Sequence, residues 1–310
     1  MSGFKKATKK QSKLRAAFFG PSGAGKTYTS LSVSEGLLSD AEKLSGNNRI
    51  GVIDTEMAAS KYADRFDFDV LELEDLSISG FTKAIRMAAE AGYPVLNIDS
   101  LTHAWQQLLQ EVGRLANAKF RGNTWSAWSE GTPLQRQLID AILSYPGHVI
   151  ATMRSKTEWQ TSQDGNGKSR PVRVGLAPEQ GKGVEYEFDL LLEISTDHIA
   201  NVIKDRTGKF QDQLIEKPGR EFGKALAEWL SDGAPAPEKK ADPTPPTADD
   251  TAMRKAVAAI DMADNEADLK RFASAVHTRQ DNGFYTSQQA QELYDLLDAR
   301  MDALRKEVVA

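Results

Sequence analysis

Cysteine is absent from the 310-residue chain. Its absence excludes disulfide bonds, thiolate nucleophiles and cysteine-ligated zinc. Histidine is scarce as well, and its four copies, His103, His148, His198 and His277, show no metal-ligand spacing. Any metal that the protein uses is therefore expected to bind oxygen ligands.

Long apolar runs are also missing, because no stretch approaches the roughly 20 residues that a membrane-spanning helix requires. The N-terminal segment MSGFKKATKKQSK is basic but lacks the apolar centre of a secretory signal. With 40% hydrophobic and 27% charged residues, the composition is typical of a soluble globular protein. We therefore expect a cytoplasmic location.

Acidic residues are absent from the first fifteen positions, although the whole chain carries a net charge of -5. This basic N-terminal arm, residues 1–13, has two interpretations: a solvated tail that aids solubility, or a local patch for nucleic acid. Its cations are Lys5, Lys6, Lys9, Lys10 and Lys13.

The run GAPAPEKKADPTPPTADD, residues 233 to 250, is rich in proline, alanine and charge and has no large apolar side chain to bury. It predicts a disordered linker, which we assign to residues 233–252. Residues 14–232 then form the core. Residues 253–310 carry apolar residues at helical spacing on both sides of DNGFY, which predicts a small helical hairpin that could bind a protein partner.

Short β-type runs alternate with helical patterns through the core. LRAAFFG, RIGVIDTE, YPVLNIDS and GHVIATM are strand-like, and helical segments lie between them. This alternation predicts an α/β fold with a mostly parallel central sheet flanked by helices. The later runs YEFDLLLEIS and ANVIKDRTG lie close together and predict a hairpin added at the sheet edge.

GPSGAGKT fits the phosphate-binding pattern G-x-x-x-x-G-K-[ST], follows an apolar strand and precedes a helical segment. The glycines let backbone N–H groups point at phosphates, Lys26 reaches the β and γ oxygens, and the Thr27 hydroxyl binds Mg²⁺. A chance glycine-rich turn would not place Lys26 and Thr27 in register. The predicted ATP-binding residues are Gly20, Pro21, Ser22, Gly23, Ala24, Gly25, Lys26, Thr27 and Tyr28.

Two further acids end predicted strands. Asp99 ends YPVLNID and is predicted to hold Mg²⁺ with Thr27, although an Asp at a strand end is also common as a turn residue. Glu56 follows the strand RIGVID and is predicted to orient the attacking water as a general base. The alternative for Glu56 is an acidic strand-to-helix turn.

The order of these motifs resembles the RecA-like ATPase core, especially the short phage-encoded AAA-domain proteins of recombination and single-strand annealing. The resemblance covers roughly residues 13 to 230 and includes Ile53, Asp54, Thr55 and Glu56, which match the family's I-D-x-E pattern, and the Asp99–Ser100 pair. It implies ATP hydrolysis, a homo-oligomeric ring or filament, and the cytoplasm of an infected bacterial host.

The resemblance also implies that Lys204 and Arg206 reach the γ-phosphate of a neighbouring subunit, since they match a K-x-K pattern with Arg in the second place. One departure concerns the family's glutamine sensor. The strand HVIATMRSK has Met153 or Arg154 near that place, which leaves the link between DNA and hydrolysis open.

The family plan has two loops that face DNA, and the corresponding segments here combine cations with aromatic residues. Positive charge follows a phosphate backbone, and aromatic faces stack bases. The first segment, RLANAKFRGNTWSAW, offers Lys119, Arg121 and Trp125, although Trp125 and Trp128 could instead form one core face of a helix. The second is a predicted long polar loop, with Arg154, Lys156, Trp159, Lys168, Arg170 and Arg173.

The leading prediction is therefore a Mg²⁺- and ATP-dependent RecA-like ATPase that acts on single-stranded DNA. One alternative is a nucleoside or small-molecule kinase, because such kinases also have a P-loop near the N-terminus. The other is an ATP-gated scaffold with little turnover that binds its partner through residues 253–310.

Overall fold

The computed structural model describes residues 6–38, 49–163, 169–234, 250–281 and 284–309. The chain divides into two compact units, Met1–Pro235 and Ala236–Ala310. In the described ranges, no helix combines the length and the apolar character needed to cross a membrane.

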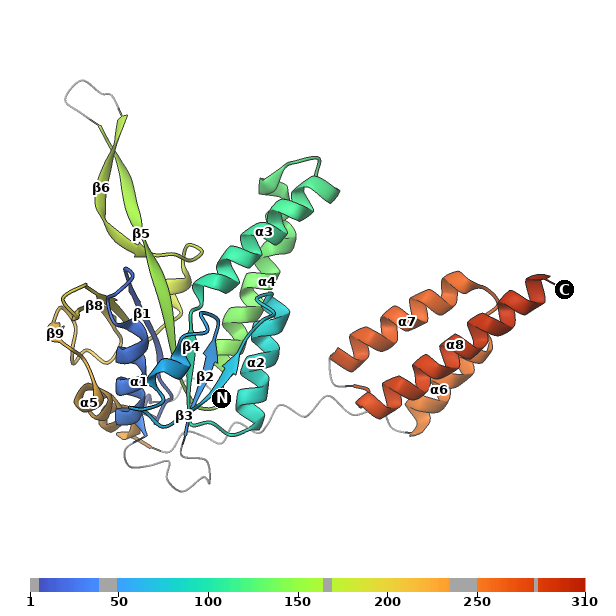
Figure 1. Cartoon of the computed structure of the whole chain (residues 1–310), viewed down its shortest axis with the longest axis horizontal. Helices are drawn as coiled ribbons and strands as arrows, with labels where there is room; N and C mark the ends of the chain where they lie inside the picture. Colours follow the sequence, from blue (N-terminus) through green and yellow to red (C-terminus); the bar gives the residue numbers. More distant parts are fainter. Residues whose placement is uncertain (1–5, 39–48, 164–168, 235–249, 282–283, 310) are drawn as a thin grey trace. The chain divides into compact units, whose positions relative to one another are not determined.

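One sheet organises the first unit, and within the described residues its strands follow the order β3-β2-β4-β5-β1-β7-β8-β9, with β6 paired to β5 (Figure 1). Strands β1 to β5 and β7 are parallel, whereas β6, β8 and β9 are antiparallel to their partners. The predicted mostly parallel sheet is confirmed. The strands are β1 (Arg15–Gly20), β2 (Ile50–Asp54), β3 (Phe68–Glu72), β4 (Val95–Asp99), β5 (His148–Gln163), β6 (Ser169–Pro178), β7 (Leu190–Ile194), β8 (Ile199–Asp205) and β9 (Leu214–Glu216).

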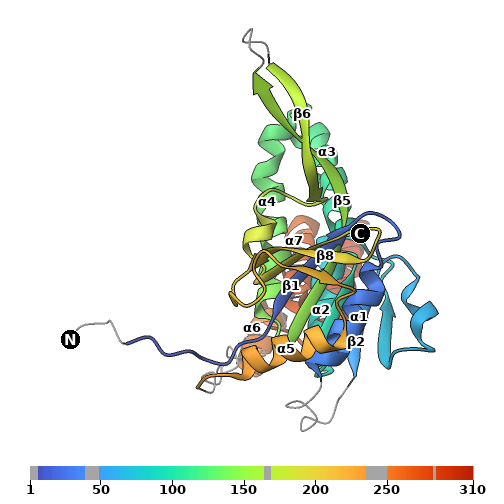
Figure 2. The same ribbon diagram turned by 90° about the vertical axis from the view of Figure 1, so that its left-hand side faces the viewer.

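Helices cover both faces of this sheet, as the turned view makes clear (Figure 2). Helices α2 to α4 share a hydrophobic cluster with Ala17 and Phe19 of β1, while α1 and α5 share another with Ala16 and Phe18. Side chains alternate along a strand, so a central strand covered on both faces must be apolar throughout. The helices are α1 (Lys26–Leu37), α2 (Ile78–Glu90), α3 (Thr102–Lys119), α4 (Thr124–Ser144) and α5 (Arg220–Ser231).

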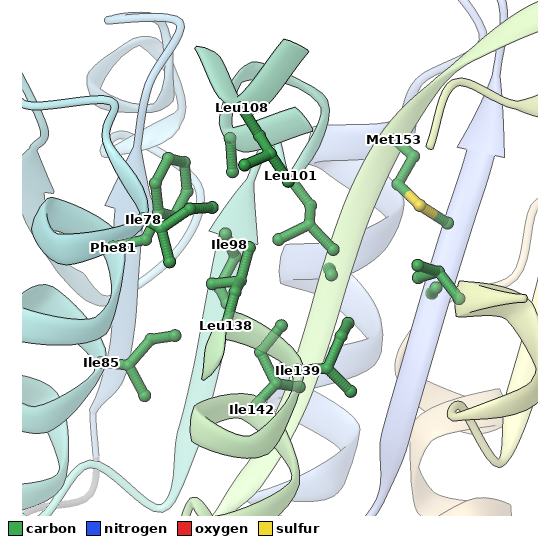
Figure 3. Close-up of a cluster of buried hydrophobic side chains, with 14 of the residues drawn as sticks. Ile78, Phe81, Ile85, Ile98, Leu101, Leu108, Leu138, Ile139, Ile142 and Met153 are labelled. Atoms are coloured by element: carbon green, nitrogen blue, oxygen red, sulfur yellow. The ribbon is translucent and has the colours of Figure 1, made fainter. Parts of the chain in front are cut away.

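The larger cluster supports the carboxyl ends of the strands. One cluster contains Ile98 near the end of β4, Met153 of β5, Phe81 of α2, Leu101 just before α3 and Leu108 of α3 (Figure 3). These side chains are all almost fully buried. Because an interior of this kind is close-packed, the residues that directly follow β2, β4 and β5 are held in fixed positions.

Helices α1 and α5 approach each other through glycines. A Cβ atom on Gly36 would lie 2.1 Å from the carbonyl oxygen of Arg220 and 2.7 Å from the Cα atom of Gly223. No larger residue fits at that separation. The contact keeps α1, which follows the P-loop, close against α5.

The segment predicted as a long polar loop is instead a β-ribbon, which corrects that prediction. Strand β5 continues beyond the sheet to Gln163 and pairs with β6 from Ser155↔Pro178 to Gln163↔Ser169. The exposed Thr157 is β-branched, a residue type that suits a strand, and cross-strand pairing satisfies the backbone of the ribbon. Lys168 lies outside the described residues.

The ribbon and the α3–α4 hairpin extend beyond the sheet in the same direction in both views (Figures 1 and 2). The first predicted DNA segment therefore forms the tip of a helical hairpin rather than an extended loop. Lys119 ends α3, Arg121 lies in the turn with a φ of 52°, and Trp125 lies in the first turn of α4.

The described part of the N-terminal arm lies along the end of the same unit. Lys9 pairs with Asp232 at 2.8 Å and lies over the Trp229 ring. Lys10 forms a bridge with Ala234, beyond the predicted core end at residue 232.

The second unit contains three helices in its described residues, α6 (Asp250–Asp261), α7 (Glu266–Asp281) and α8 (Ser287–Val309). The sequence predicts a hairpin of two helices, because the helical pattern before DNGFY is continuous in apolar spacing. It divides at Asn265, whose side-chain oxygen accepts a hydrogen bond from the Asp268 N–H and caps α7. The unit has its own core, which includes Leu269, Leu293 and Leu297.

Candidate functional site

The loop between β1 and α1 has the backbone shape of a phosphate cradle. Gly23 and Gly25 adopt φ values of 80° and 81°, a left-handed region that glycine enters without strain. A Cβ atom on Gly20 would lie 2.2 Å from the carbonyl oxygen of Ile194 at the end of β7. Helix α1 begins directly after the loop, so its N-terminal N–H groups face the same space.

Lys26 and Thr27 lie at the start of α1. The Lys26 ammonium donates hydrogen bonds to the carbonyl oxygens of Gly20 at 3.1 Å and Pro21 at 2.9 Å. Burial lowers the pKa of Lys26, and the nearby carboxylates of Asp99 and Glu56 oppose that shift. The chain thus holds a partly desolvated cation over the loop, which favours an anionic ligand.

Asp99 joins three elements at the carboxyl edge of the sheet. It ends β4, accepts a hydrogen bond from the Thr27 hydroxyl of α1 at 2.6 Å, and accepts another from the Thr152 hydroxyl of β5. Its side chain is 4% exposed. Burial raises the pKa of Asp99, and the two hydroxyl donors oppose the rise.

The residues present fit Mg²⁺ at this point. The Thr27 and Asp99 oxygens are the hard ligands that Mg²⁺ prefers, and they converge beside the P-loop. Among the described residues, the Asp99 carboxylate has hydroxyl donors but no ion pair. A divalent cation there would offset the cost of burying its charge.

Glu56 is positioned by the backbone turn that follows β2. The buried Asp54 carboxylate accepts hydrogen bonds from the N–H groups of Glu56 at 2.9 Å and of Ala58 and Ala59 at 2.8 Å each. The turn also places Met57 at a φ of 52°. Asp54 therefore has a structural role, and it leaves the Glu56 side chain facing the cavity beside the P-loop.

A second network links the ends of β2 and β4. The Thr55 hydroxyl accepts from the Ser100 N–H at 2.8 Å and lies 2.6 Å from Nδ1 of His103 in α3. Burial lowers the pKa of His103, and Arg154 lowers it further. The sequence predicts no role for His103, because a lone histidine in a helical segment has no recognisable spacing.

The P-loop, Glu56 and Asp99 line one cavity of about 660 Å³. Predicted residues that line it include Lys26, Thr27, Glu56 and Asp99, so four separate predictions meet at one place. Residues that the sequence did not single out also line it. They are Thr29, Ser32, Tyr62, Arg65, His198, Lys217, Pro218 and Gly219.

His198 and Lys217 reach the cavity because β8 returns antiparallel to β7. His198 occupies the turn before β8 and lies 3.1 Å from the Ala24 carbonyl oxygen, and the Lys217 N–H donates to the His198 carbonyl oxygen. No motif marks either residue. Only the sheet topology brings residues about 170 to 190 positions later against the P-loop.

Aromatic rings form one wall of the cavity. Tyr28 is 45% exposed, and its ring makes edge contacts with Tyr62 at 6.2 Å and Phe66 at 5.2 Å between centroids. Tyr28 and Tyr62 line the cavity and offer an aromatic surface on which a nucleobase can stack.

A family model described as an AAA domain matches residues 12–214, about two thirds of the chain. The chain belongs to this AAA-domain family. Its first unit is accordingly a P-loop ATPase core with an α/β fold, and nucleotide binding and hydrolysis are the activities of that class. No curated protein matches the chain.

Three of the predicted DNA residues bond to groups of their own chain. Lys119 pairs with Glu130 of α4 at 2.9 Å, and Arg154 pairs with Glu56 at 2.9 Å. Lys156 donates to the Gln180 carbonyl oxygen. Trp159, Arg170 and Arg173 lie on ribbon strands, and their side chains fall outside the described set.

The two tryptophans of α4 have different surroundings. From the sequence, we expect each either to face DNA or to form part of a helix core. Trp125 is 87% exposed, whereas the Trp128 ring stacks on Trp105 of α3 with centroids 5.6 Å apart. Trp128 is thus part of the helical packing. Trp125 alone remains available to a partner.

Lys204 and Arg206 lie far from the P-loop of their own chain. Asp205 between them pairs with Leu190, at the start of β7, whereas the P-loop lies against the end of β7. Lys204 donates to the carbonyl oxygens of Glu185 and Tyr186, and Arg206 pairs with Asp189. Within one chain these cations bond to residues at the amino ends of the parallel strands. Their role toward a neighbouring subunit stays a prediction.

The second unit contains a smaller cavity of about 440 Å³. It lies against α6, α7 and the residues before α8, with Ile260, Phe272, Val276, Phe284 and Tyr285 in its lining. It shares no residue with the nucleotide cavity of the AAA domain.

Proposed function

We propose that the chain is a RecA-like, Mg²⁺-dependent ATPase that acts on single-stranded DNA, of the kind that phages use in recombination or annealing. The observation that carries the proposal is the convergence of Lys26, Thr27, Glu56 and Asp99 on one cavity beside the P-loop. These are the parts that phosphoryl transfer to water requires: a phosphate cradle, a metal site and a base.

The chain's own residues divide the work. The P-loop N–H groups and Lys26 bind the β- and γ-phosphates, so the Lys26 ammonium exchanges its loop carbonyls for phosphate oxygens. Mg²⁺ held by Thr27 and Asp99 would supply positive charge against the charge that develops on the γ-phosphate. The Asp54 turn holds Glu56 where its carboxylate can orient water and accept its proton.

Two features support DNA as the substrate. The ribbon leaves the sheet directly beyond Arg154, at the edge where the nucleotide cavity lies, and its sequence carries Lys168, Arg170 and Arg173. The α3–α4 hairpin extends in the same direction, and the exposed Trp125 lies in the first turn of its second helix. Cations with aromatic faces suit a single strand, whose unpaired bases are free to stack.

The deciding experiment is the steady-state ATPase rate of the full chain with Mg²⁺, with and without single-stranded DNA. We expect turnover without any phosphoryl acceptor and salt-sensitive DNA binding in the presence of a non-hydrolysable ATP analogue. Release of ADP only when an acceptor is added would identify a kinase. Tight ATP binding with negligible turnover would identify an ATP-gated scaffold.

We also propose that the active species is a homo-oligomer, in which Lys204 and Arg206 complete a neighbour's site. Arginine and lysine supplied by a second subunit can stabilise transition-state charge. Specific activity should then rise with protein concentration, along with the mass measured by light scattering. Full specific activity from a strict monomer would contradict the oligomer and leave the ATPase proposal standing.

A further inference from the structure

Arg154 occupies the junction between the sheet and the ribbon. Its backbone pairs with Gly20 of the P-loop strand, whereas the next residue, Ser155, already pairs with β6. The Arg154 N–H donates to the Thr102 hydroxyl at 2.9 Å, and its carbonyl oxygen accepts from the Glu179 N–H at 2.7 Å. The backbone of Arg154 is therefore fixed from both sides.

The Arg154 side chain turns toward the nucleotide site. Its Nε and Nη2 atoms donate to the same carboxylate oxygen of Glu56, Oε1, at 3.2 Å and 2.9 Å. No described residue bonds to the other oxygen, Oε2. The guanidinium thus fixes one side of the Glu56 carboxylate and leaves the second oxygen available to a water in the cavity.

A contribution to the stability of the fold does not explain the Arg154–Glu56 ion pair. The two side chains are 45% and 33% exposed, and ion pairs with this exposure add little to the free energy of unfolding. Glu56 already has its backbone held by Asp54, but its side chain has rotatable bonds that the turn does not restrict. An arginine, with its planar fork of donors, suits the task of fixing a carboxylate plane.

We propose that Arg154 is a positioning residue for hydrolysis: it holds Glu56 by Oε1 so that Oε2 is directed at the attacking water. The proposal rests on the ATPase function proposed above and moves Arg154 from the DNA surface to the nucleotide site. A water oriented by a fixed carboxylate reacts faster than one beside a mobile carboxylate, because the reactive geometry is populated more often.

The test is a double-mutant cycle on the full chain, with Arg154→Ala, Glu56→Gln and the combination. We expect Arg154→Ala to lower kcat about 10-fold or more, with KM for ATP within about twofold of wild type. In the Glu56→Gln background the same change should have almost no further effect, because the residue acts through Glu56. Arg154→Lys should restore part of the loss, since it keeps the charge but not the fork.

Arg49→Ala is the matched control. Arg49 precedes β2, the strand that leads to Glu56, and pairs with Asp69 at 2.7 Å at the opposite edge of the sheet. Removing this ion pair should leave kcat unchanged. Melting temperature and ATP-analogue binding, measured for every variant, identify any protein that fails to fold.

Three results would overturn the proposal. If Arg154→Ala raises kcat, the pair restrains Glu56 instead of positioning it. If the losses from Arg154→Ala and Glu56→Gln add fully, or if KM rises with them, Arg154 acts on the nucleotide directly. If Arg154→Ala weakens DNA binding and leaves DNA-free kcat intact, Arg154 belongs to the DNA surface. A Glu56→Gln enzyme as fast as wild type would instead remove the general-base role on which both proposals depend.

Discussion

The nucleotide cavity and the β5–β6 ribbon lie at the same edge of one sheet, yet they are built differently. Asp99 in the cavity lining and Asp54 behind Glu56 are buried and accept hydrogen bonds from neighbouring elements or turns. The ribbon consists of two strands that pair with each other beyond the sheet. Buried groups that bond to one another hold a reactive site in a fixed geometry, whereas a two-stranded ribbon beyond the sheet is suited to contact a partner.

The comparison predicts that mutations in the cavity impair ATP binding or hydrolysis, whereas mutations in the ribbon impair DNA binding. Lys26→Ala should have the largest effect and abolish tight ATP binding or turnover. The substitution removes the only Lys in the P-loop, whose positive charge neutralises the β- and γ-phosphate oxygens. ATPase rate and ATP-dependent shift in melting temperature measure it. Unchanged hydrolysis in this variant would contradict the nucleotide site altogether.

Glu56→Gln should keep nucleotide binding and slow hydrolysis by about 100-fold or more, the scale expected for loss of a general base. The turn that holds Glu56 depends on Asp54 and on backbone N–H groups, so the substitution leaves its fold intact. Single-turnover rates and titration with an ATP analogue separate the two effects. A parallel loss of binding would assign Glu56 a structural role.

Substitutions in the segment from β5 to β6 should affect DNA binding and leave ATP hydrolysis without DNA unchanged. Replacing Lys168, Arg170 and Arg173 by Ala should weaken binding to single strands and flatten its salt dependence, whose log–log slope is about -0.7 per neutralised phosphate. Trp159→Ala should cost roughly 1–3 kcal/mol of affinity with little change in slope, if a base stacks there. Fluorescence anisotropy at several salt concentrations checks both, and DNA-free ATPase should stay at the wild-type rate.

A smaller effect should appear in the pH dependence of stability. Burial and Arg154 lower the pKa of His103, so the folded chain binds this proton more weakly than the unfolded chain. The folded state therefore loses stability as pH falls through the ordinary range of histidine, near 6.5. His103→Gln, which can still bond to Thr55, should reduce the drop in melting temperature between about pH 7.5 and 5.5 by roughly 2 °C.

Calorimetry of the nucleotide-free protein at both pH values provides the measurement. The groups that face His103 are Arg154, Glu56, Asp99 and Glu179, and they are identical in the two proteins. An equal drop in both would mean that His103 has no share in the pH dependence.

Removal of the second unit should have the smallest effect. Residues 233 and 234 belong with the first unit, because Ala234 exchanges backbone hydrogen bonds with Lys9 and Gln11. A chain that ends at Pro235 should therefore keep the ATPase rate and melting temperature of the AAA domain. Aggregation or unfolding of the shortened chain would show that residues 236–310 are needed for the core.

Short-range patterns in the sequence predicted the parallel sheet, the P-loop and the two acids at strand ends. They could do so because the determinants are local: φ angles that favour glycine, apolar runs buried on both faces, and a fixed spacing from Gly20 to Thr27. The fold class and the ATPase core are confirmed by the sheet and by the family match. The assignments of Glu56 and Asp99 agree with the cavity that they line and await mutation.

Only the tertiary structure decided which cations belong to which region. In the sequence, Arg154 is one of several basic residues in a predicted polar loop. The pairing of β5 with β4, and of β4 with β2, brings it to Glu56. His198 and Lys217 carried no motif and reach the P-loop through an antiparallel return of the chain. The physical reason is that local sequence fixes the conformation of a segment, whereas contacts between residues a hundred positions apart depend on strand order and register.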